Sequence, residues 1–124
     1  MGRALWVVAL GGAAGSVLRF SLGLALSQAG ATARLPLSTL AVNIAGSLAI
    51  GAVSGWLARM PAASPDVRHF VVTGVLGGFT TYSAFAIETV ALAQAGTPAL
   101  ALLHVAAHIV LGLGAAWCGA RLAS

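Results

Sequence analysis

A dense run of hydroxyl side chains follows two adjacent glycines inside a long apolar segment. The run reads Gly77, Gly78, Phe79, Thr80, Thr81, Tyr82, Ser83, Ala84, Phe85. Adjacent glycines weaken a helix, and nearby hydroxyls can bond to the backbone groups that a break sets free. Non-helical backbone at membrane depth is tolerated only where protein buries it or where it lines a water-filled space. The run therefore indicates either a glycine-rich packing kink or a discontinuous helix whose backbone ends form an ion site.

Two aromatic rings in this run have a spacing that suits contact with an anion. Tyr82 and Phe85 are three residues apart, and Ser83 follows the tyrosine. An aromatic ring carries partial positive charge at its edge, so two ring edges can favour a desolvated anion without the trapping effect of a full positive charge. A break at 77–80 would also leave unpaired carbonyl groups, which suit a hard cation.

A second polar face is formed by Thr39, Asn43 and Ser47, which are spaced i, i+4 and i+8 and so share one side of a helix. The Asn43 amide has two N–H donors. One interpretation is a hydrogen bond that holds two helices together, and the other is a donor that lines an anion pathway.

His104 and His108 are also four residues apart on one face. Such a pair can bind a metal ion, although two histidines alone make a weak metal site. The alternatives are hydrogen-bonded packing residues, or imidazole N–H donors in an anion pathway whose protonation makes conduction sensitive to pH.

Two charged side chains lie within apolar segments, Arg19 in the first and Glu88 in the third. A charge inside a span is costly, so it should be paired, face water or extend to the interface. The first and third spans run in the same direction, which places both residues in the half distant from the termini. We therefore expect them to interact through space or through water.

The composition shows that membrane helices must position these residues. The chain has 124 residues, of which 60% are hydrophobic and 6% charged. Four segments are long enough to cross roughly 30 Å of hydrocarbon, which takes about 20 residues. They are predicted at about 5–26, 37–57, 67–95 and 98–120, and form one transmembrane domain over residues 1–124. The prediction is an all-α, multi-pass membrane protein in contact with a lipid bilayer.

Charge and motif content argue against other classes of protein. The net charge of +4 comes from scattered arginines, without the basic stripe or arm that nucleic-acid binding needs. The sequence has no nucleophile motif, metal triad or phosphate-binding loop, so we expect no enzyme activity. The main alternative function is a small multidrug-type exporter of cations, but such an exporter would need an acidic residue in its first span, where this chain has Arg19.

Three motifs resemble the Fluc (CrcB) family of fluoride channels. The stretch 77–85 followed by Glu88-Thr89 is similar to the signature of the third helix, 39–46 is similar to the second helix, and 11–20 is similar to the first. The motifs occur in the family's order, and the resemblance covers essentially the whole chain.

The resemblance implies a homodimer of oppositely inserted subunits in the cytoplasmic membrane, a third helix broken at its middle, and passive fluoride export. It implies a structural Na⁺ ion at the dimer interface, held by the backbone carbonyls of Gly77 and Thr80. The implied fluoride pathway is lined by Asn43, Tyr82, Ser83, Phe85, Thr39, Glu88, His104 and His108, while Arg19 has a structural role.

The chain departs from the family pattern at several positions, and one of them is Ala84, which replaces what is often a hydroxyl residue. Tyr82 replaces the usual phenylalanine, while His104 and His108 stand where a tyrosine and a hydroxyl residue are usual. The arginines also fall unequally on the two sides of the membrane, with Arg34 among the few on the side away from the termini, a bias larger than insertion in both directions favours.

Overall fold

The fold is a bundle of four long apolar helical spans. The computed structural model describes residues 2–28, 35–60 and 62–123. The elements in chain order are α1 (Gly2–Gln28), α2 (Leu37–Ala58), α3 (Pro65–Arg68), η1 (His69–Leu76), α4 (Gly77–Phe79), α5 (Tyr82–Gln94) and α6 (Pro98–Leu122). Within the described residues, four spans are long and apolar enough to cross a membrane. The prediction of an all-α protein with four spans is confirmed.

The third span, Pro65–Gln94, is not one regular helix. It begins with α3, which is capped by the Ser64 hydroxyl, and continues through the wide π-helical turns of η1 into α4. The backbone is then extended at Thr80 (φ −79°, ψ 155°) and Thr81 (φ −144°, ψ 112°) before α5 begins. The predicted break in the third helix is present, but it lies at residues 80–81 rather than 77–80.

Glycines let α1 pack directly against η1 and α4. A Cβ atom on Gly11 would lie 2.5 Å from the Phe70 carbonyl oxygen, and one on Gly15 would collide with the carbonyl oxygen of Val75. Gly78 stays helical, and a Cβ there would lie 2.5 Å from the carbonyl oxygen of Gly12. Gly78 thus serves close helix packing, and the break falls at the two threonines that follow.

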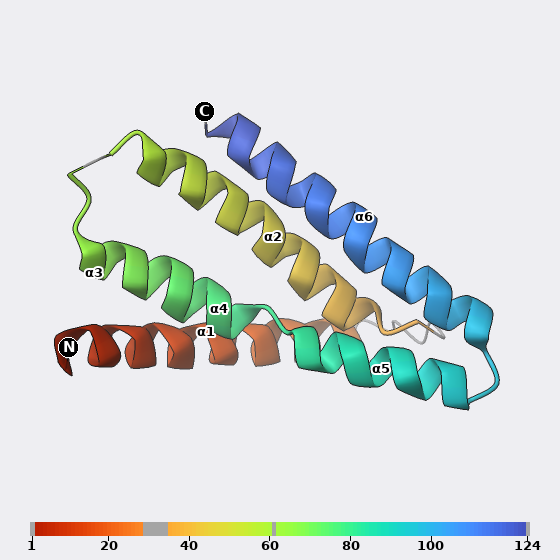
Figure 1. Ribbon diagram of the computed structural model, residues 1–124. Helices are drawn as coiled ribbons and strands as arrows, with labels where there is room; N and C mark the ends of the chain where they lie inside the picture. The colour runs from red at the N-terminus through yellow and green to blue at the C-terminus, as the bar shows by residue number, and fades with distance from the viewer. Residues whose placement is uncertain (1, 29–34, 61, 124) are drawn as a thin grey trace.

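The other close pair is α2 and α6, which lie side by side in Figure 1. Gly51 faces the carbonyl oxygen of Ala116, and Gly119 faces that of Leu48, so no side chain separates the two backbones. The break lets α5 leave α1 and run beside α6 (Figure 1). The third span therefore joins the two helix pairs.

The outer surface of the bundle is strongly apolar. Large hydrophobic side chains are exposed along all four spans, among them Trp6, Phe20, Ile87 and Leu113. Such a surface suits lipid or a second protein chain. Both termini lie toward the same end of the bundle (Figure 1), as an even number of spans requires. Arg34, one of the arginines in the charge-bias prediction, lies outside the described residues.

We predict that Gly15→Ala destabilises the bundle because the new methyl group would meet the backbone of η1, where no flexible side chain can move away. Overpacking of this kind costs about 1–3 kcal/mol. Thermal unfolding of the purified protein in detergent, followed by circular dichroism, measures the effect. Gly12→Ala is the matched control on the same helix, because a Cβ atom there has nothing within 4 Å. Equal stability of the two variants would contradict the packing described here.

Candidate functional site

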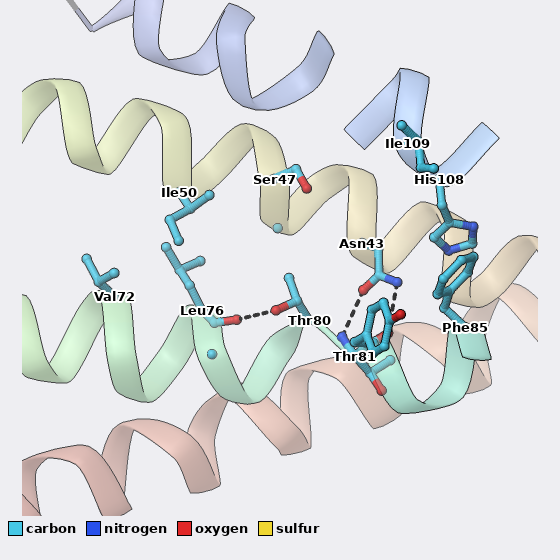
Figure 2. Close-up of a pocket in the computed structure, with 13 residues that line it drawn as sticks. Asn43, Ser47, Ile50, Val72, Leu76, Thr80, Thr81, Phe85, His108 and Ile109 are labelled. Atoms are coloured by element: carbon cyan, nitrogen blue, oxygen red, sulfur yellow. Dashed lines mark hydrogen bonds between the residues drawn. The ribbon is translucent and has the colours of Figure 1, made fainter. Parts of the chain in front are cut away.

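One side chain from α2 forms hydrogen bonds with the non-helical backbone at the break in the third span. The Nδ2 group of Asn43 donates to the carbonyl oxygen of Thr81 (3.0 Å), and the Thr81 N–H donates to Oδ1 of Asn43 (2.8 Å). Figure 2 shows the asparagine reaching the break from α2, with both hydrogen bonds drawn. The amide therefore replaces the helical partners of both backbone groups of one residue, Thr81. Of the two interpretations of Asn43, the hydrogen bond between helices is confirmed, and the second Nδ2 proton remains available.

The two threonines at the break close the helix ends beside them. The Thr80 hydroxyl and the Thr80 N–H both donate to the carbonyl oxygen of Leu76, at 3.0 and 3.1 Å, and complete the last turn before the break. The Thr81 hydroxyl accepts from the N–H of Ala84 (3.2 Å), which makes Thr81 the N-cap of α5. This cap was not predicted from the sequence, although a threonine just before a helical segment is a standard signal for one.

Backbone groups at the break remain free on both sides. Within the described residues, the carbonyl oxygens of Gly77 and Thr80 receive no hydrogen bond, and the N–H groups of Tyr82 and Ser83 find no acceptor. A helix C-terminus carries partial negative charge and a helix N-terminus partial positive charge. The break thus presents cation-favouring oxygens and anion-favouring N–H groups within a few residues of each other.

A groove opens next to the break, with a volume of about 390 Å³. Its walls come from α2, η1, α4, α5 and α6, and Figure 2 shows the side chains that line it. Six of the predicted site residues lie in this lining: Asn43, Gly77, Thr80, Tyr82, Phe85 and His108. The Tyr82 and Phe85 ring centroids are 5.5 Å apart, and Tyr82 is 79% exposed. The structure therefore brings the aromatic pair and the break together on one open face.

Three other predicted residues form a cluster behind Phe85. The Thr39 hydroxyl donates to Oε1 of Glu88 (2.6 Å), and Oε2 of Glu88 lies 3.6 Å from Nε2 of His104. His104 is only 1% exposed. Neither Oε2 of Glu88 nor Nε2 of His104 has a hydrogen-bond partner in the described part of the chain.

His108 connects this cluster to the groove. Its ring centroid lies 4.4 Å from that of His104 and 4.5 Å from that of Phe85. The Nδ1 atom of His108 lies 3.0 Å from the carbonyl oxygen of His104, and because a carbonyl can only accept, neutral His108 carries its proton on Nδ1. In the described ranges, no group of three or more His, Cys, Asp or Glu side chains is arranged to hold a metal ion.

Arg19 forms no ion pair with Glu88 within the described residues, and their expected interaction through space or through water stays a prediction. The Nε group of Arg19 donates to the carbonyl oxygen of Gly78 (3.2 Å), which also receives the Ser16 hydroxyl (3.5 Å). Arg19 therefore stabilises the C-terminal end of α4, because a cation favours the negative end of a helix. It also lines a second hollow of about 330 Å³ together with Thr39 and Thr81. Ser83, the remaining predicted residue, lies 3.3 Å from the Thr81 hydroxyl.

These features define a small multi-pass membrane protein whose third span is broken around an asparagine clamp. Residues 6–120 match the model of the CrcB-like protein family, Camphor Resistance (CrcB). The chain belongs to this family.

Curated relatives match nearly the whole chain. A protein of Novosphingobium aromaticivorans is 47% identical over 113 residues, which cover 90% of this chain and 89% of the relative. A protein of Methylobacillus flagellatus is 42% identical, with 94% and 91% covered, and one of Flavobacterium psychrophilum is 39% identical, with 98% and 97% covered. All three relatives are named fluoride-specific ion channel FluC.

We predict that Asn43→Asp loosens the break. The aspartate loses the donor to the Thr81 carbonyl, and a polar group left unsatisfied in a buried position costs about 1–3 kcal/mol. Hydrogen–deuterium exchange should therefore speed up at the amides of residues 80–84. Ser47→Ala, one turn further along α2, is the matched control, because the structure gives the Ser47 hydroxyl no hydrogen bond among the described residues. Unchanged protection in Asn43→Asp would rule out the clamp.

Proposed function

We propose that this chain forms a fluoride-selective channel that lets fluoride leave the cell passively and so lowers its cytoplasmic concentration. The observation that carries the proposal is the clamped break beside a ring-lined groove, in a member of a family whose relatives are named fluoride-specific ion channels. The relatives are named as channels and not as enzymes, in agreement with the sequence-based expectation.

The donors around the break suit the chemistry of fluoride. Fluoride is small and holds its water strongly, so a pore must offer donors of moderate strength in place of that water. The free N–H groups of Tyr82 and Ser83 lie at the N-terminus of α5, where the helix dipole favours an anion. The second Nδ2 proton of Asn43 and the edge of the Phe85 ring lie beside the same groove. None of these groups carries a full positive charge, so the ion is stabilised without being trapped.

A second copy of the chain is needed to narrow the groove. A water molecule takes up about 30 Å³ in the liquid, so a groove of about 390 Å³ leaves an ion in contact with many waters. The exposure of Tyr82 also leaves one side of the aromatic pair uncovered. We infer a homodimer that covers this face, with the two subunits inserted in opposite directions as in the family that the sequence resembles, in the inner membrane of the cell.

The free carbonyls at the end of α4 fit a sodium ion at this interface. Gly77 and Thr80 line the groove, and their carbonyl oxygens are without donors among the described residues. Oxygen ligands suit a hard cation. Two copies meeting at the break would supply four carbonyl oxygens, and the ion would hold the two breaks together without taking part in fluoride transfer.

The small multidrug-type exporter is not favoured. The α1 span has no acidic residue to exchange for a cationic substrate, and its one internal charge, Arg19, is bonded to the Gly78 carbonyl. The relatives that match the chain are named as fluoride channels.

The function is tested by fluoride efflux from liposomes that contain the purified protein, followed with a fluoride electrode and a potassium ionophore. We expect rapid fluoride release and no comparable chloride release. Tyr82→Phe keeps the ring edge and removes only the hydroxyl, so its rate should stay within about a factor of two of the unmodified chain. Release no faster than from empty liposomes would overturn the assignment.

The dimer and sodium proposals predict that Gly77→Leu weakens self-association. Gly77 is exposed and a Cβ atom there meets only the Val72 carbonyl at 3.7 Å, so the single chain has room for a side chain that a second copy would not tolerate. Size-exclusion chromatography with light scattering measures the dimer fraction in detergent. This fraction should be lower in the Gly77→Leu variant than in the unmodified chain. It should also fall when sodium is replaced by N-methylglucamine. Gly114→Leu, at another exposed glycine with nothing within 4 Å, is the control. A purely monomeric wild type would contradict the proposal.

A further inference from the structure

The cluster of Thr39, Glu88 and His104 next to Phe85 carries the negative charge of the Glu88 carboxylate. The surrounding groups compensate this charge only in part. The Glu88 carboxylate receives one hydrogen bond, from the Thr39 hydroxyl, and its second oxygen is buried without a donor. The side chain of Glu88 is 26% exposed, while that of its neighbour His104 is 1% exposed. A buried, partly unsatisfied carboxylate is unfavourable unless a cation or a proton neutralises it.

No cation among the described residues faces this carboxylate. The charged and titratable groups on the elements around His104 are few. In α2 there are none, α5 has Glu88 and Tyr82, and α6 has His108 nearby and Cys118 and Arg121 toward its other end. Tyr82 contacts Phe85 and is mostly exposed. Arg19 of α1 donates to the Gly78 carbonyl. The titratable group that faces the unsatisfied oxygen is therefore the His104 imidazole, 3.6 Å away.

From this geometry we propose that Glu88 and His104 together bind one proton from water, and that this proton increases fluoride flux. The proton is shared between Oε2 of Glu88 and Nε2 of His104, two buried atoms that otherwise lack partners. Two groups this close titrate as a pair, so the proton belongs to the pair and not to either residue alone. The partial exposure of Glu88 gives the proton a way in, and the net charge of the cluster changes from −1 to 0.

The cluster acts on the pathway through Phe85. The Phe85 ring centroid lies 5.5 Å from that of His104 and 4.5 Å from that of His108, and the same phenylalanine lines the groove. A fixed negative charge behind this ring repels fluoride in front of it. Binding of a proton removes the repulsion, so flux should rise as the pH falls. This inference rests on the proposed fluoride conduction.

The test is fluoride efflux from proteoliposomes between about pH 8 and pH 5.5, the range in which histidine pairs commonly titrate. Leakage from empty liposomes is subtracted at each pH. We expect the rate to rise on the order of tenfold, which is the effect of one unit charge acting over roughly 10 Å at an effective dielectric constant of about 20. His104→Gln and Glu88→Gln should each abolish most of this pH dependence. His69→Gln, the same substitution on η1 and outside the cluster, should keep it.

A second readout does not depend on flux. Imidazole nitrogen resonances of ¹⁵N-histidine-labelled protein, assigned with His104→Gln, should report titration of His104, and its midpoint should move in Glu88→Gln. Flux that is independent of pH, or a pH dependence that survives in His104→Gln, would overturn the proton site and leave the channel function intact. No fluoride flux at any pH would instead overturn the channel function, and the resonances would still decide whether the pair binds a proton.

Discussion

The bidentate contact between Asn43 and Thr81 is the interaction on which the rest of the site depends. A break in a membrane helix exposes peptide groups that water cannot reach, and each such group costs several kcal/mol in hydrocarbon. Asn43 satisfies both the N–H and the C=O of Thr81. Gly46, one turn further along α2, lets that helix approach the side chain of Thr80 closely. Without these two hydrogen bonds, we expect a continuous third helix to have the lower free energy.

The clamp also separates two ends of opposite electrostatic character. The turns before the break end in free carbonyl oxygens, while α5 begins with free N–H groups. Because both ends lie within four residues, a cation site and an anion path can be neighbours without competing for the same atoms. Arg19 and Ser16 bond to the Gly78 carbonyl and remove it from the set of free oxygens. Gly77 and Thr80, which both line the groove, keep carbonyl oxygens without donors in the described part of the chain.

Much of this arrangement could be predicted from local sequence, because membrane helices are recognised by their length and apolar composition. The four spans followed from length and composition, and the shared face of Thr39 and Asn43 followed from spacing. The broken third helix was one of two alternatives that the residues left open, and the resemblance implied it. The position of the break did not follow from spacing, since it depends on a side chain 38 residues away that bonds to Thr81. Three further features depend on which helix packs against which, and a single sequence does not contain that information. They are the role of Gly78 in packing, the π-helical turns and the bond from Arg19 to the Gly78 carbonyl.

His104 and His108 place imidazole rings at positions of α6 where the family that the sequence resembles usually has hydroxyl groups. A hydroxyl can donate and accept at once, whereas a neutral imidazole nitrogen does only one of the two. His108 uses its Nδ1 proton on the backbone of its own helix, so its buried Nε2 atom is left as an acceptor. His104 and Glu88 leave two more unpartnered atoms facing each other. A proton is the one species small enough to satisfy two such atoms without moving a helix. These unpartnered atoms are the reason for the proposal that the pair binds a proton and that flux responds to pH.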